Sequence, residues 1–289
     1  YLAGAYYYYY SAEHLFDPFL QIPPAKLGAA DRAKTPGTFR ILTLGGSTTA
    51  DLRLPPEARY PRLLEGLVQK NHPDLKIEVF NGGQDWYTTK HALIKYTTNL
   101  KDWQPDRLIV MHAINDVYRS FADPEFTVGG YDTLWSHYYG PSIQGAKPPT
   151  FETFLLSFVD KYWFYDQRYR ERDLPLDRYR SLPEFRRNLS ALIHYLRVDG
   201  VRVVLMTEPT IYKDVMSPEE QAALWFGKGL SKERLGRYFY EYPSPSSLRR
   251  AMEAYNQVVK ETGARENVSV IDLDSKIPKT LEYFLDDCH

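Results

Sequence analysis

Three short apolar runs in the first half of the chain each end on glycine or polar residues and then give way to a helical pattern. They cover residues 39–44, 76–80 and 107–112, and are followed by Gly-Gly-Ser, Asn-Gly-Gly and Ala-Ile-Asn-Asp. Runs of this length that are rich in leucine and β-branched residues are typical of buried strands. Strands that alternate with helices form βαβ units, so the pattern predicts an α/β fold with a parallel sheet.

The same alternation returns in the second half. Helical periodicity over residues 182–198 precedes an apolar run at 201–206, and a second helical pattern at 246–262 precedes a run at 268–271. These runs bring the predicted parallel sheet to five strands. Residues 278–285 are predicted to form a short helical piece before the chain ends.

We predict one domain over residues 39–289, preceded by an arm and linker at 1–38 that contains several prolines. Two stretches break the alternation, at about 117–180 and 208–245, and we interpret them as insertions. Within the first, residues 151–172 have the pattern of one long amphipathic helix. Insertions near the carboxyl ends of strands commonly determine the substrate.

Composition limits the function classes. The chain has 289 residues and a formal net charge of -1, which argues against a nucleic-acid partner held by phosphate neutralisation. Cys288 is the single cysteine, so the sequence allows neither an intrachain disulfide nor a metal site built from several cysteines. No role is assigned to Cys288, because a lone cysteine usually serves packing.

The N-terminal segment bears on location. Residues 1–10 are aromatic and apolar but too short to span a bilayer, which takes about 20 residues. The chain begins at Tyr1 rather than methionine, so we expect a processed or omitted leader, a membrane anchor upstream of Tyr1, and a periplasmic, secreted or anchored location. An aromatic arm packed on the body is the alternative. Self-assembly of copies through this arm is an expectation of the non-catalytic module hypothesis given below.

Ser47 stands where the first predicted strand meets a sharp turn. Glycines at 45 and 46 permit such a turn, and ligands of open α/β sheets bind beyond the carboxyl ends of the strands. Ser47 is therefore a candidate nucleophile, a phosphate ligand or a plain turn residue. Phosphate binding is the weakest of these, because no lysine follows the glycines as a P-loop requires.

A serine nucleophile needs a base and a group that orients it. His289 has Asp286 three residues before it, a spacing that places both side chains on one side of a turn. His112 ends the third predicted strand and is expected to support the site rather than act as a base. The remaining histidines have no local partner pattern and are interpreted as structural or surface residues: His14, His72, His91, His137 and His194.

An acyl-transfer site also needs donors for the developing oxyanion. The Ser47 N–H, the Gly83 N–H and the Asn115 amide follow the first, second and third predicted strands, so they are expected to meet at one sheet edge. Asp116 is interpreted as a helix N-cap.

The order of these residues resembles the four blocks of the SGNH, or GDSL-like, hydrolases. The blocks are Gly45-Gly46-Ser47-Thr48-Thr49, Asn81-Gly82-Gly83, Ala113-Ile114-Asn115-Asp116 and Asp286-Asp287-Cys288-His289. The resemblance implies a flavodoxin-like, three-layer α/β/α fold that carries a serine esterase or acylhydrolase site without metal or cofactor. Ser47 would be the nucleophile, His289 the base and Asp286 the orienting acid. Gly83 is preferred to Gly82 as an oxyanion donor because the family usually has Asn-Ala-Gly there.

Three departures from the family pattern stand out. Gly46 occupies the position of an aspartate, Ala113 occupies that of a glycine, and the sequence ends at His289, where the family normally continues into a helix. Two function hypotheses follow. One is an esterase that removes small acyl groups, such as O-acetyl groups on a glycan, with aromatic residues near 131–139 and 162–169 stacking on sugar. The other is a non-catalytic binding or assembly module, in which the imidazole would lie away from Ser47.

Overall fold

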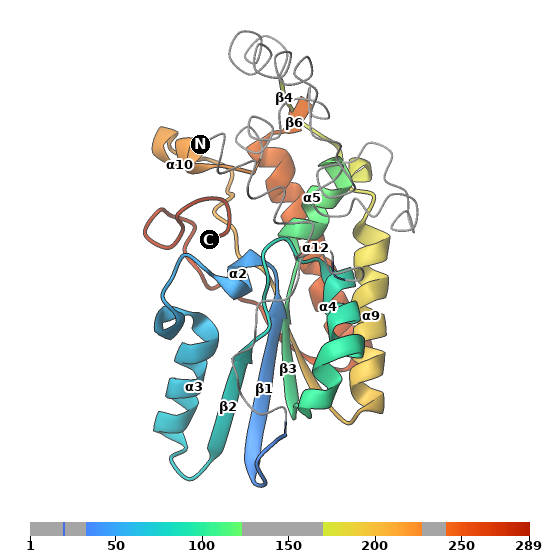
Figure 1. Ribbon diagram of the computed structural model, residues 1–289. Helices are drawn as coiled ribbons and strands as arrows, with labels where there is room; N and C mark the ends of the chain where they lie inside the picture. Colours follow the sequence, from blue (N-terminus) through green and yellow to red (C-terminus); the bar gives the residue numbers. More distant parts are fainter. Residues whose placement is uncertain (1–19, 21–32, 123–169, 227–240) are drawn as a thin grey trace, which may run out of the picture.

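The computed structural model describes residues 20, 33–122, 170–226 and 241–289, and their centre is a parallel sheet of five strands (Figure 1). The strand order is β2-β1-β3-β5-β7, with β1, β3 and β5 in the interior. This confirms the predicted α/β fold. The strands are β1 (Thr38–Gly45), β2 (Lys76–Asn81), β3 (Arg107–Met111), β5 (Arg202–Met206) and β7 (Ser269–Ile271).

The register of the sheet brings the three central strands to an end at one level. Gly45 of β1 lies opposite Met111 of β3, and Met111 lies opposite Met206 of β5. The residues that follow these three strands therefore leave the sheet side by side. This alignment is what places a site at the carboxyl edge.

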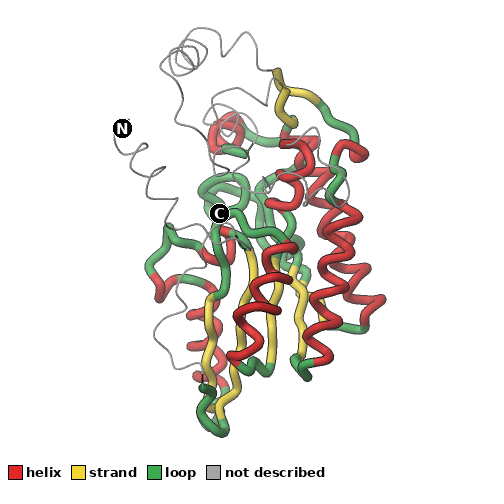
Figure 2. Tube along the Cα trace, turned by 45° about the vertical axis from the view of Figure 1, so that its right-hand side comes forward, coloured by secondary structure: helices red, strands yellow, loops and turns green. Residues whose placement is uncertain are grey.

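Helices cover both faces of the sheet. Helix α3 (Tyr60–Asn71) lies against one face, whereas α4 (Thr89–Lys95), α9 (Leu182–Val198) and α12 (Pro245–Glu266) pack together over the other, as Figures 1 and 2 show. Helix α5 (Ile114–Ala122) contacts α9 and α12 on that second side. The described residues thus form the three layers expected from the sequence.

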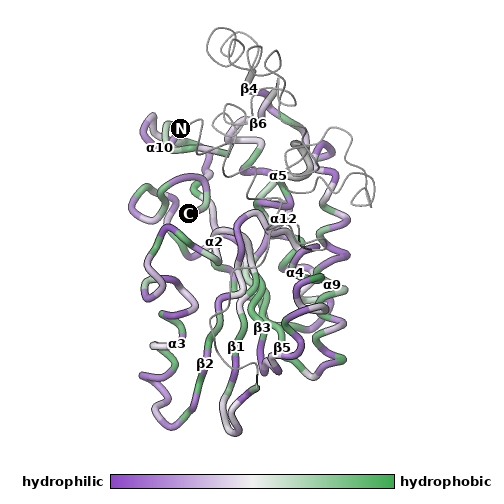
Figure 3. The backbone as a smooth tube through the Cα atoms, viewed as in Figure 1, coloured by the Kyte–Doolittle hydropathy of each residue, from purple (hydrophilic) through white to green (hydrophobic). Residues whose placement is uncertain are grey.

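Alternating strand residues supply the two cores. Leu42, Leu108 and Leu205 belong to the larger cluster, under α4, α9 and α12, whereas Ile109 and Met206 belong to a smaller one that meets α3. Successive side chains of a strand point to opposite faces, so a strand covered on both sides is apolar throughout. Figure 3 accordingly shows β3 and its neighbours green along most of their length.

Two predicted segments take other forms. Residues 170–172, the predicted end of a long helix, form strand β4 (Arg170–Arg172), which pairs in parallel with β6 (Glu241–Pro243). The Asp173 carboxylate accepts hydrogen bonds from Ser247 and Arg250 and so ties β4 to the beginning of α12. These long-range contacts outweigh local helical propensity. Residues 151–169 lie outside the described part.

The predicted helix at 278–285 is a set of turns. The N–H groups of Tyr283 and Phe284 both donate to the Thr280 carbonyl, but the next N–H, that of Leu285, donates to the His289 carbonyl instead. The turn therefore does not propagate. The first insertion also begins later than predicted, since α5 continues to Ala122, and the second contains the short helix α10 (Pro218–Ala223).

Among the helices within the described ranges, none has both the length and the hydropathy that a membrane span requires. The expected anchor upstream of Tyr1 would lie before this sequence. Most of the arm at 1–38 lies outside the described residues.

Candidate active site

Ser47 lies where the sequence predicts it, at the beginning of helix α2 (Ser47–Ala50) directly beyond β1. The Thr49 and Ala50 N–H groups donate to the Gly46 carbonyl and close the turn. A Cβ atom at Gly46 would lie 2.5 Å from the Asn115 Nδ2, so the Asn115 amide would have to shift to admit one. Glycine at position 46 therefore lets the Asn115 amide lie directly against the Ser47 turn.

The structure brings Ser47, His289 and Asp286 together, although 242 positions separate the serine from the histidine. The Ser47 hydroxyl donates to His289 Nε2 over 2.7 Å. On the other side of the ring, His289 Nδ1 lies 2.8 Å and 3.0 Å from the two carboxylate oxygens of Asp286. An Nδ1–H that donates to the carboxylate leaves Nε2 as the proton acceptor, which is the tautomer a general base needs.

The Asp286 carboxylate is held on three sides. Its Oδ1 accepts the N–H groups of Cys288 and His289 over 3.1 Å and 3.0 Å, and its Oδ2 accepts from Arg53 over 2.5 Å. Burial alone would raise the pKa of Asp286, but the hydrogen bond and charge of His289, the Cys288 N–H and Arg53 together hold that pKa well below its ordinary value. The carboxylate therefore stays charged beside the imidazole.

The last residues of the sequence are anchored by their neighbour Asp287. Its buried carboxylate accepts from the Tyr212 hydroxyl over 2.5 Å and from the N–H groups of Trp225 and Phe226 over 2.5 Å and 2.9 Å. The Ile211 N–H donates to the Asp287 carbonyl. His289 is thus fixed beside α2, where Figure 1 shows the C-terminus.

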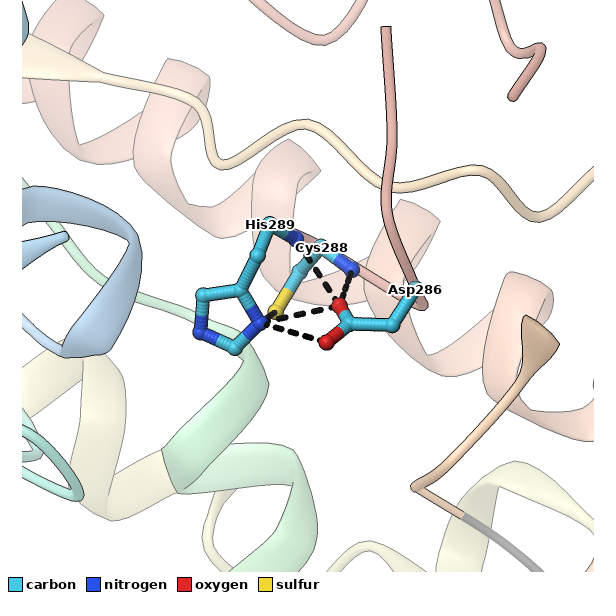
Figure 4. A group of neighbouring side chains, drawn as sticks. All are labelled: Asp286, Cys288 and His289. Atoms are coloured by element: carbon cyan, nitrogen blue, oxygen red, sulfur yellow. Dashed lines mark hydrogen bonds and ion pairs between the residues drawn. The ribbon is translucent and has the colours of Figure 1, made fainter. Parts of the chain in front are cut away.

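Asp286, Cys288 and His289 also form a group whose ligand atoms lie within 4.8 Å of one another (Figure 4). A metal ion here would compete with the hydrogen bonds that join His289 Nδ1 to the carboxylate. A metal ligand must be the thiolate, yet burial, aided by the carboxylates of Glu208, Asp286 and Asp287, raises the pKa of Cys288 well above its ordinary value. The geometry fits a hydrogen-bonded acid–histidine pair better than a metal centre.

Asn115 lies beside the Ser47 turn, as predicted. It is in the first turn of α5, is 5% exposed, and its Nδ2 donates to the Tyr87 carbonyl over 3.0 Å. Within the described part of the chain, the Ser47 N–H donates to no protein acceptor. An amide and a backbone N–H therefore converge next to the serine, an arrangement suited to an oxyanion.

The third predicted donor is engaged elsewhere. The Gly83 N–H donates to the side chain of Asn81 over 2.9 Å, inside the turn that follows β2. A Cβ atom at Gly83 would lie 2.4 Å from the Ala50 N, so this glycine allows the turn to pack closely on α2. These observations argue against the prediction that Gly83 is an oxyanion donor and assign it a packing role.

Asp116 has the structural role that the sequence predicts, but at a different helix. Its carboxylate accepts from the N–H and the hydroxyl of Thr89, over 3.1 Å and 2.7 Å. Thr89 begins α4, so Asp116 satisfies that helix from within α5. The contact joins two helices that the sequence separates, which no local pattern indicates.

The other histidines do not approach Ser47 where they are described. His112 is 2% exposed, and burial lowers its pKa to about 3, so it stays neutral; His91 is bonded to Thr88 over 2.9 Å. His72 and His194 are exposed on helices or turns. The predictions for His14 and His137 lie outside the described residues.

A cluster of aromatic rings flanks the loop between β2 and α4. Trp86, in this loop, has a φ of 66°, and its ring lies 5.4 Å from that of Tyr118 and 5.7 Å from that of Trp225. A positive φ is strained for so bulky a residue, and such strain concentrates at functional sites. Sequence reasoning missed Trp86, because only the backbone geometry distinguishes it. The aromatic residues predicted at 131–139 and 162–169 lie outside the described residues.

A buried cation supports the same loop. Lys95 is 0% exposed, its Nζ donates to the Gly82 carbonyl over 2.7 Å, and it lies 5.3 Å from the centre of the Tyr87 ring. Burial lowers the pKa of Lys95 to about 8. Because Tyr87 is the residue whose carbonyl accepts from Asn115, the lysine stabilises the loop that positions this amide.

Lys95 predicts a pH dependence of stability. Between about pH 8 and 10 the folded state releases the Lys95 proton while the unfolded state keeps it, so the free energy of unfolding should rise with pH, by on the order of 2 kcal/mol. Urea unfolding at about pH 8 and pH 10 measures this rise. Lys95→Met should remove the rise, whereas Lys70→Met, at an exposed position, should retain it. Equal slopes in both variants would contradict the assignment.

Comparison with known proteins agrees with this geometry. Residues 43–289 match the model of the GDSL-like Lipase/Acylhydrolase family. No curated protein sequence matches the chain. Among solved structures, an acetylxylan esterase from Geobacillus stearothermophilus, Axe2, is 19% identical, with 86% of this chain and 82% of that chain covered and a TM-score of 0.48. LAE5, an alpha/beta hydrolase enzyme from the metagenome of Lake Arreo, is 14% identical, with coverages of 85% and 82% and a TM-score of 0.47.

Proposed function

Because the chain belongs to the GDSL-like lipase/acylhydrolase family, we propose that it is a serine esterase that cleaves small acyl esters through an acyl-enzyme at Ser47. The observation that carries the proposal is the 2.7 Å contact between the Ser47 hydroxyl and His289 Nε2, with Asp286 on the opposite ring nitrogen. The alternative, a binding module with a vestigial site, requires the imidazole to lie away from Ser47, and this contact disfavours it.

In the first step, Ser47 Oγ attacks the ester carbonyl carbon while its proton passes to His289 Nε2. The carbonyl oxygen becomes an oxyanion, which accepts from the Ser47 N–H and the Asn115 amide. Asp286 stabilises the imidazolium that has formed. The tetrahedral intermediate then collapses, the bond to the alcohol oxygen breaks, and His289 returns the proton to the leaving alcohol.

In the second step, water completes the cycle. His289 accepts a proton from a water molecule, whose oxygen attacks the acyl carbon, and then returns that proton to Ser47 Oγ as the acid leaves. For the substrate, we propose an O-acetylated glycan. The half-buried rings of Trp86 and Trp225 support this choice, because aromatic faces beside a serine site suit the apolar face of a sugar.

A fluorophosphonate probe tests the nucleophile. The protein should be labelled, and Ser47→Ala should abolish labelling together with hydrolysis of short-chain nitrophenyl esters and acetylated glycans. Ser275→Ala removes an exposed hydroxyl and should leave both unchanged. Equal labelling of the wild type and Ser47→Ala would end the proposal.

Asn115→Ala should lower kcat about 10²- to 10³-fold with little change in KM, because the lost amide donates to the oxyanion rather than to the ground-state ester. Steady-state kinetics on nitrophenyl acetate measure the split. Asn115→Asp is a control of equal size that removes the donor, and it should be at least as slow. A rise in KM at unchanged kcat would instead assign Asn115 to substrate binding.

A further inference from the structure

Glu208 is a buried carboxylate directly beyond β5, at the same sheet edge as Ser47 and Asn115. It is 2% exposed, its Oε1 accepts from the Thr48 hydroxyl over 2.9 Å, and its Oε2 accepts from the Ile114 N–H over 2.8 Å. Within the described ranges, neither lysine nor arginine forms an ion pair with it. A buried carboxylate without a cationic partner is costly, and such groups occur where they serve a purpose.

The backbone of Glu208 is fixed as firmly as its side chain. Its N–H donates to Asn256 Oδ1 over 3.0 Å, and its carbonyl accepts from Asn256 Nδ2 over 2.9 Å. Asn256 is buried in the middle of α12. This paired contact places the carboxylate at a set distance from the helix layer.

The two groups that Glu208 binds are next in sequence to the predicted nucleophile and to the predicted oxyanion donor. Thr48 follows Ser47 in α2, and Ile114 precedes Asn115 in α5. A single carboxylate therefore bridges the turn that carries the serine and the turn that carries the amide. The strand register aligns these turns only at the level of the backbone, and the carboxylate joins them through two hydrogen bonds.

We propose that Glu208 is a positioning residue, which sets the spacing of Ser47 and Asn115. This inference rests on the esterase function proposed above. Glutamate suits the place, because an ionised carboxylate only accepts hydrogen bonds and both partners are donors. A glutamine has one carbonyl oxygen, so it could accept from the Ile114 N–H only if its NH2 group turned to the Thr48 hydroxyl, which would then have to accept instead of donate.

The charges around Glu208 agree with this role. Burial raises the pKa of Glu208, whereas the Ile114 N–H, the Thr48 hydroxyl, the Ala113 N–H and the charge of His289 lower it. Among the described residues, the Cys288 thiol and the Tyr60 hydroxyl also face it, and both are neutral at pH 7 because burial raises the pKa of each. Within this part of the chain, Glu208 is held by hydrogen-bond donors rather than by an ion pair.

Glu208→Gln, Thr48→Val and Thr48→Ser test this role. Glu208→Gln should lower kcat on nitrophenyl acetate about 10- to 100-fold with KM within about threefold. A loss in kcat rather than KM is expected because the spacing of Ser47 and Asn115 matters most in the transition state.

Thr48→Val removes the hydrogen bond from Thr48 but leaves the Glu208 carboxylate in place, so it should lower kcat about tenfold. Thr48→Ser restores the hydroxyl and should restore kcat. Wild-type kcat in a folded Glu208→Gln protein would overturn the proposal. If Glu208→Gln does not fold, wild-type kcat in Thr48→Val would overturn the positioning role.

The outcome is distinguishable from failure of the esterase function. If the wild type is not labelled at Ser47, the proposed esterase function is wrong. The contact between Glu208 and Thr48 can then still be tested by measuring the free energy of unfolding of the variants. A double-mutant cycle of Glu208→Gln and Thr48→Val should show coupled losses of stability. Additive losses would overturn the bridge regardless of activity.

Discussion

Replacing His289 with alanine should lower kcat for ester hydrolysis by about 10⁴- to 10⁶-fold with little change in KM. The imidazole is the only described base in contact with Ser47 Oγ, so without it the hydroxyl keeps its proton. Steady-state kinetics and the rate of fluorophosphonate labelling measure the loss. Added imidazole should restore part of the labelling, since the variant leaves a space beside Ser47.

His194→Ala is the matched control, because it removes an exposed ring from α9 and should leave kcat unchanged. A loss of less than about tenfold in His289→Ala would show that another group accepts the serine proton. The chain would then have to bring that group to Ser47 by a movement of the segments that carry it.

Asp286→Asn should lower kcat about 10³- to 10⁴-fold while the protein stays folded. An amide can donate to His289 Nδ1, which favours the tautomer with the proton on Nε2, the wrong one for accepting from Ser47. Steady-state kinetics of Asp286→Asn, compared with those of Arg53→Gln, measure the loss of kcat. Arg53 is half exposed, so its ion pair with Asp286 contributes only about 0–1 kcal/mol. We therefore expect Arg53→Gln to lower kcat less than tenfold.

Asp286→Asn should also change how the free energy of unfolding depends on pH in the acid range. Burial raises the pKa of Asp286, but His289, the Cys288 N–H and Arg53 favour the charged form more strongly. The folded-state pKa of Asp286 therefore lies below its unfolded value. The carboxylate therefore contributes stability above about pH 4, which is lost as the pH falls through the folded-state pKa. Asp286→Asn should unfold with a weaker pH dependence between about pH 4 and 2. An unchanged slope would contradict the assignment.

Much of the fold could be predicted from local patterns. The apolar runs at 39–44 and 107–112 became β1 and β3, and the helical periodicity at 182–198 became α9. In such segments propensity, pattern and burial agree. Residues 170–172 and 278–285 were predicted wrongly, because pairing with β6 and a hydrogen bond to the His289 carbonyl decide their form.

The candidate site was predictable in part for the same reason. Ser47, Asn115 and the Asp286–His289 pair occupy turns whose residue types are visible in the sequence, and the structure brings them together. The exception is Gly83. Its place beside a strand end suggested a donor, but the direction of its N–H depends on the side chain of Asn81, which sequence spacing does not reveal.

The sequence by itself determined the order of strands and helices, the sharp glycine turn before Ser47, and the acid–histidine spacing, because each depends on neighbouring residues. Only the tertiary structure decided that His289 reaches Ser47, that Asp287 holds the segment carrying it, and that Glu208 joins two turns. The physical reason is distance along the chain. These contacts form between residues 61 to 242 positions apart, and they exist only because a parallel sheet brings its strand ends to one edge.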